Sequence, residues 1–123
     1  MNEIIKICIL AILIFIVDLP WLLFQQQWVK SIIEDIQEGR EMYTRAWAGI
    51  PVYVALAYLV TQAHSAPRAA LMGMCVYAVY DFTQIFTFDK YPIEFAVADT
   101  LWGGLLMAFI WWIGSRNQLT SAV

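Results

Sequence analysis

Four long apolar segments, separated by short polar stretches, dominate the pattern of this sequence. They cover residues 7–24, 46–62, 69–86 and 93–113. As α-helices rising about 1.5 Å per residue they would each measure about 25–31 Å. That length is close to the hydrocarbon core of a bilayer, which is about 30 Å thick. Because a helix satisfies its backbone polar groups within one segment, the pattern predicts four transmembrane helices.

Turn-forming residues separate these helices. Residues 25–27, three glutamines, follow the first segment, while residues 65–68 and 89–92 each contain a proline and connect the later ones. Such connections favour antiparallel neighbours. We therefore expect an all-α fold, a four-helix transmembrane bundle with antiparallel helices, forming a single integral membrane domain over residues 1–123.

The longest connection, residues 25–45, has a helical pattern of its own. Four apolar residues recur at helical spacing and four charged residues lie between them: Trp28, Ile32, Ile33 and Ile36, with Lys30, Glu34, Asp35 and Glu38. This pattern is typical of an amphipathic helix that lies in the membrane interface. We expect an interfacial helix between helices 1 and 2, which would be either a lid over a cavity or an ordinary connector.

Composition supports a membrane protein and argues against several other classes. The chain is 62% hydrophobic and only 14% charged, whereas soluble domains carry about 25% charged residues. Its net charge of −3 and its lack of any Lys/Arg run argue against nucleic acid, whose phosphates require a basic surface. A single histidine, two cysteines and no CxxC motif argue against a Cys/His zinc site.

The predicted topology places both termini on one side of the membrane. Basic residues are divided almost equally between the two sides, so they do not set an orientation. Six acids fall on the side opposite the termini, in the connections and at the start of the fourth helix: Glu34, Asp35, Glu38, Glu41, Asp89 and Glu94. On this basis we expect a multi-pass protein with both termini in the cytoplasm.

Three aspartates interrupt the apolar segments. Because a carboxylate at membrane depth is costly, it marks a functional site by default. Counting about 1.5 Å per residue from the face where helices 1 and 3 end, Asp18 lies about 9 Å deep, Asp81 about 7.5 Å and Asp99 about 6–9 Å. Antiparallel threading therefore predicts that the three acids occupy one layer, approached from three different helices.

Other polar and aromatic residues are expected near this layer. Tyr77 and Gln84 share a helical face with Asp81, and each of the other two aspartates is followed three residues later by a tryptophan. Gly103 and Gly104 would allow close helix approach. The predicted cavity is lined by Asp18, Asp81, Asp99, Gln84, Trp21, Trp102, Tyr53, Tyr77 and Thr83, with Arg45 at its rim.

The acidic layer permits two interpretations. Like charges in a low-dielectric site oppose one another's ionisation, so the layer would either hold protons or bind a cation. The alternative is that the acids only hold the bundle together through interhelical hydrogen bonds.

The leading hypothesis is a membrane protein that binds or translocates a proton, a cation or a small cationic solute, with Arg45 and the amphipathic segment gating access. Four helices leave a narrow pathway, so a homodimer is plausible. The second hypothesis is an enzyme that acts on a lipid or isoprenoid and whose aspartates hold Mg²⁺ to a diphosphate. The sequence contains no DDxxD-like cluster to support this hypothesis, so we do not expect an enzyme. A structural or partner-stabilising subunit is the third. The sequence specifies no metal or cofactor.

The motifs around the aspartates resemble domain-of-unknown-function family 2177. Its members are small predicted membrane proteins with an Asp-x-x-Trp-Leu motif in the first helix, Tyr-Asp-x-Thr-Asn in the third and Asp-x-x-Trp-Gly in the fourth. The corresponding residues here are Asp18, Trp21 and Leu22, then Tyr80, Asp81, Thr83 and Gln84, then Asp99, Trp102 and Gly103.

The resemblance covers nearly the whole chain and is strongest over residues 77–104. Gln84 stands where the family usually has Asn, and the segment between helices 1 and 2 is more acidic than expected for the family. The resemblance implies that Asp18, Asp81, Asp99 and Trp102 belong to the characteristic pattern. It implies no activity, because the function of the family is unknown.

Overall fold

The described residues form four α-helices. A computed structural model of the chain describes residues 2–36, 47, 49–87 and 92–120. The helices are α1 (Glu3–Ile36), α2 (Gly49–Thr61), α3 (Ala66–Thr87) and α4 (Ile93–Arg116), and the described ranges contain no strand. The predicted all-α bundle is confirmed.

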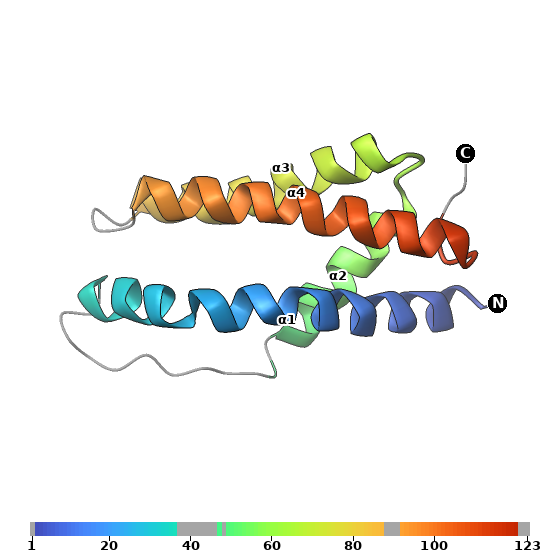
Figure 1. Cartoon of the computed structure of the whole chain (residues 1–123), viewed down its shortest axis with the longest axis horizontal. Helices are drawn as coiled ribbons and strands as arrows, with labels where there is room; N and C mark the ends of the chain where they lie inside the picture. The colour runs from blue at the N-terminus through green and yellow to red at the C-terminus, as the bar shows by residue number, and fades with distance from the viewer. Residues whose placement is uncertain (1, 37–46, 48, 88–91, 121–123) are drawn as a thin grey trace.

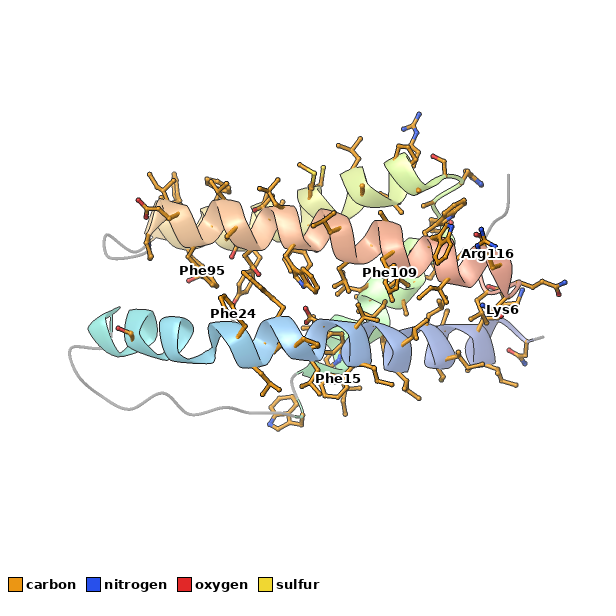
Figure 2. The ribbon with its side chains drawn as sticks, in the orientation of Figure 1. Lys6, Phe15, Phe24, Phe95, Phe109 and Arg116 are labelled. Atoms are coloured by element: carbon orange, nitrogen blue, oxygen red, sulfur yellow. The ribbon has the colours of Figure 1, made fainter. Side chains whose placement is uncertain are left out.

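The helices associate as two pairs that meet along α1 and α4. Helices α3 and α4 lie side by side over most of their length, α1 packs mainly against α2, and α1 and α4 join the two pairs. Figure 1 shows that α1 and α4 run in opposite directions while α2 crosses them at an angle. Both termini lie at one end of the bundle, where Lys6 and Arg116 also lie in Figure 2. We call this the terminal end, and the end where α3 stops and α4 starts the hairpin end.

Helix α1 differs from its predicted bounds. We expected it to stop at Phe24 and a separate interfacial helix to follow. Instead the helix continues without a break to Ile36, and its last turns extend along the axis of α1 in Figure 1. The physical reason is that glutamine has good helix propensity, so the three glutamines end the apolar stretch without ending the helix.

Helix α2 is shorter than predicted. Its 13 residues measure about 20 Å, less than the hydrocarbon core. Within the described ranges, three helical stretches are candidate membrane spans by length and composition, Glu3–Phe24, Ala66–Phe86 and Ile93–Arg116, and α2 is an additional apolar helix. Residues 46 and 48, which belong to the predicted second helix, lie outside the described residues.

Glycines bring α3 and α4 into direct backbone contact. A Cβ on Gly73 would collide with the carbonyl oxygen of Gly103, and a Cβ on Gly103 would collide with the ring of Tyr77. On Gly104, a Cβ would lie 2.6 Å from Cγ of Met74. The close approach expected from Gly103 and Gly104 is confirmed, and Gly73 supplies the matching surface on α3.

The interface between α1 and α4 is apolar toward the terminal end. Leu10 and Ile14 of α1, and Leu106 and Ile110 of α4, are at most 1% exposed and belong to one core cluster. Most large side chains on the outer surfaces are apolar and exposed, as expected of residues that face lipid. The polar part of the interface therefore begins where this core ends, toward the hairpin end.

Candidate binding site

Asp18 lies at the centre of three helices. Its side chain is on the inner face of α1 and is only 3% exposed. The Trp102 indole Nε1 of α4 donates to Oδ1 at 2.6 Å, and the Tyr53 hydroxyl of α2 donates to Oδ2 at 2.7 Å. Both carboxylate oxygens therefore have a donor, each from a different helix.

Asp99 repeats this arrangement in the opposite direction. It lies on α4 and accepts a hydrogen bond from the Trp21 indole Nε1 of α1 at 2.9 Å. The aspartate of each Asp-x-x-Trp motif thus accepts a hydrogen bond from the tryptophan of the motif on the other helix. The two indoles stack, with ring centroids 5.7 Å apart and an angle of 22° between the planes. We call these four residues, Asp18, Trp21, Asp99 and Trp102, the indole–carboxylate clasp.

An antiparallel register explains why the bonds are reciprocal. The residue numbers of the two bonded pairs add up to the same value, as they must when two antiparallel helices are in register. The same register pairs Leu10 with Ile110 and Ile14 with Leu106, all of which are core residues. The clasp and the apolar core are therefore parts of one continuous interface.

The clasp places its aspartates at two levels. Asp99 and Trp21 form the level nearer the hairpin end, about 9 Å from the start of α4. Asp18 and Trp102 lie three residues further along α4, which is about 4.5 Å deeper. The acidic layer therefore has an outer and an inner carboxylate along the bundle axis.

Asp81 lies on the inner face of α3 and is completely buried. Tyr77, one turn earlier on α3, lies between Asp81 and the clasp. Its ring packs on Gly103, and its phenol is within electrostatic range of all three aspartates and of Tyr53. The register that places Tyr77 beside Gly103 also places Asp81 level with Asp99. The acids of α1, α3 and α4 therefore surround one region around Tyr77.

Of the other residues expected to line the cavity, some face the aspartates and others do not. Gln84 is half-buried on the face of Asp81, whereas Thr83 is exposed on the other side of α3. Arg45 lies outside the described residues. Tyr80, which the sequence indicated only as part of the family motif and not as a lining residue, is 63% exposed but lies within electrostatic range of Asp81 and Asp99. Helical spacing did not indicate this position, because adjacent helical residues point about 100° apart.

The described residues that donate hydrogen bonds to Asp18 and Asp99 carry no positive charge. No Lys, Arg or His occurs in residues 7–24, 49–61, 69–86 or 93–113, and the donors to Asp18 and Asp99 are neutral indole and phenol groups. Hydrogen bonds to an ionised acceptor are about twice as strong as neutral ones, but they leave the net charge unchanged.

The aspartates do not form a compact metal-ligand set. Among the described residues, no group of three or more His, Cys, Asp or Glu side chains is close enough to hold a metal ion. The geometry instead presents three buried acids in an aromatic environment, and the carboxylates of Asp18 and Asp99 accept hydrogen bonds from indole and phenol groups.

Comparison with known proteins places the chain in a family. A family model described as a predicted membrane protein, that of domain-of-unknown-function family 2177, matches residues 3–115. The resemblance inferred from the aspartate motifs is confirmed. Searches of curated proteins and of solved structures found no match.

Proposed function

We propose that this chain, which belongs to domain-of-unknown-function family 2177 of membrane proteins, binds or translocates a proton, a cation or a small cationic solute at its buried aspartates. The proposal rests mainly on one observation. Asp18, Asp81 and Asp99 are at most 7% exposed, and the side chains that donate to Asp18 and Asp99 within the described residues are neutral indole and phenol groups.

The physical argument is one of charge neutrality. Removing a carboxylate from water costs several kcal/mol, on the order of the stability of a small protein, unless the group is neutralised or paired. Neutral donors reduce this cost but do not supply positive charge. A bound proton or cation would supply it, and this supports a binding site at the buried aspartates.

Liposomes containing the purified chain test this function. We expect a flux of protons or cations that exceeds that of empty vesicles and that is abolished by Asp81→Asn, with Asp18→Asn and Asp99→Asn also impaired. Glu94→Gln is the matched control, since Glu94 is an exposed acid in the first turn of the same helix as Asp99. Wild-type vesicles that neither transport nor bind any of these species would refute the proposal.

A structural role is the second candidate, and the clasp itself favours it. Reciprocal bonds between α1 and α4 are a plausible device for fixing the register of two antiparallel helices. In that case the three Asp→Asn variants would alter assembly and stability but no flux would exist to be lost. A homodimer, which would widen the pathway, remains part of the first proposal and is tested by the mass of the reconstituted protein.

A further inference from the structure

The two aspartates of the clasp are related by pseudo-symmetry but are not equivalent. Asp18 is 3% exposed and accepts two hydrogen bonds, from Trp102 and Tyr53. Asp99 is 7% exposed, and within the described part of the chain it accepts one bond, from Trp21. The difference arises because α2 contributes Tyr53 only to the Asp18 side.

The two carboxylates also differ in depth. Asp99 lies nearer the hairpin end, and Asp18 lies about 4.5 Å further along the bundle axis. Asp18 and Asp99 are within electrostatic range of one another. Counting only bonds between described residues, the outer carboxylate accepts fewer hydrogen bonds and is slightly more exposed, while the inner one is held on both oxygens.

We infer that Asp99 and Asp18 bind protons in a fixed order, with Asp99 exchanging protons with water at the hairpin end and Asp18 receiving them from Asp99. This inference rests on the proposed function and names the proton as its ligand. In the step, the O–H bond of protonated Asp99 breaks, water carries the proton, and an O–H bond forms on the carboxylate of Asp18. The pair keeps a single negative charge throughout.

The surrounding groups are compatible with a proton at this place. Among the described residues, the titratable groups that interact electrostatically with the pair are Tyr53 from α2 and Tyr77 and Tyr80 from α3, and Asp81 interacts with both tyrosines of α3. None of these described groups is basic, so none of them supplies a permanent positive charge to the pair. A proton can bind one carboxylate oxygen without the several ligands that a metal ion requires.

The indoles act as positioning residues in this scheme. Trp21 fixes the carboxylate of Asp99 and Trp102 that of Asp18, and their stacked rings keep the two levels adjacent. Neither indole gains or loses a proton in this scheme, so neither carries the transferred proton.

Time-resolved infrared spectroscopy after a pH jump tests the order, using the full chain in vesicles. The carbonyl bands of protonated Asp99 and Asp18 are assigned from Asp99→Asn and Asp18→Asn. We expect the Asp99 band to rise first in the wild type. Asp99→Asn should slow protonation of Asp18 by about tenfold or more, the scale of a lost proton donor, whereas Asp18→Asn should leave the Asp99 rate unchanged.

Two further variants distinguish loss of proton transfer from loss of folding. Asp99→Glu keeps the carboxyl group and should restore most of the Asp18 rate, which a purely structural role of Asp99 would not predict. Trp21→Phe keeps both acids and removes the donor to Asp99. It should change the protonation rate of Asp99 directly and that of Asp18 only as a consequence.

The outcomes separate this inference from the proposed function. Equal Asp18 rates in the wild type and Asp99→Asn, or a slowed Asp99 in Asp18→Asn, would overturn the order while leaving proton binding intact. Binding of a cation with no protonated carboxyl band in any variant would overturn the inference but support the function. If the wild type bound neither protons nor cations, both would fail.

Discussion

Single residues decide whether the buried acids are tolerated. Asp18 is buried because two neutral donors from two other helices reach its two oxygens. Sequence reasoning identified Asp18, Trp21, Asp99 and Trp102, since polar and aromatic residues are conspicuous in an apolar segment. It did not predict that each tryptophan bonds the aspartate of the other helix, because helix rotation and register depend on the packing of the whole interface.

Removing the indole of Trp102 tests the strength of the clasp. Trp102→Phe leaves Asp18 buried with one donor fewer, and hydrogen bonds to charged groups contribute about 1.5–3 kcal/mol. We expect the free energy of unfolding in mixed detergent micelles to fall by about that amount.

Trp112→Phe is the matched control for this measurement. Trp112 lies on the same helix, is 47% exposed and contacts Phe109 and Arg116 on the surface. Its replacement should have little effect on stability. Equal losses in the two variants would mean that the Trp102–Asp18 bond has no special importance.

Whole elements show where the sequence pattern is sufficient and where it is not. The existence of α3 and α4 followed from their long apolar segments, and their bounds differ from the prediction by only a few residues. The three glutamines after Phe24 end the apolar stretch and therefore predict the end of α1, but glutamine has good helix propensity and the helix continues through them. Gly73 was not selected, since a glycine within an apolar segment acquires a role only from the helix opposite.

The α3–α4 contact predicts a graded response to added methyl groups. Gly73→Ala should be the most damaging change, because its Cβ meets the backbone carbonyl of Gly103, which cannot rotate away. We expect a loss of about 1–3 kcal/mol, the usual cost of overpacking. Thermal unfolding of the purified protein measures it.

Gly49→Ala provides the comparison on another helix. A Cβ there would lie 3.7 Å from the Tyr53 ring, an ordinary contact distance, so stability should be unchanged or slightly improved. If Gly73→Ala were equally harmless, the two helices would not be in backbone contact at this point.

The molecule as a whole is arranged as expected, with one qualification. Hydropathy and turn residues were enough to predict an all-α membrane bundle with its termini at one end. They did not reveal that α2 is short and crosses the others at an angle. That arrangement follows from its packing: Leu56, Ala57 and Val60 of α2 are buried in the common core.

Accessibility of single cysteines tests the topology, in a chain whose Cys8 and Cys75 are replaced by serine. Asn2→Cys and Asn117→Cys should react with a membrane-impermeant maleimide from the same side, which we expect to be the cytoplasmic one. Ser31 lies near the end of α1 and is exposed, so Ser31→Cys should react from the opposite side of the membrane. Labelling of Asn2→Cys and Asn117→Cys from opposite sides would show that an odd number of helices crosses the bilayer.

The spacing between the two levels of the clasp determines how strongly transfer between them would respond to membrane voltage. With helices near the membrane normal, a step of about 4.5 Å covers roughly 15% of a core about 30 Å thick. A full crossing changes the energy of one charge by about 2.3 kcal/mol per 100 mV, so this step changes it by only about 0.3 kcal/mol. A potential of that size would alter the occupancy ratio of the two carboxylates by less than about a factor of two.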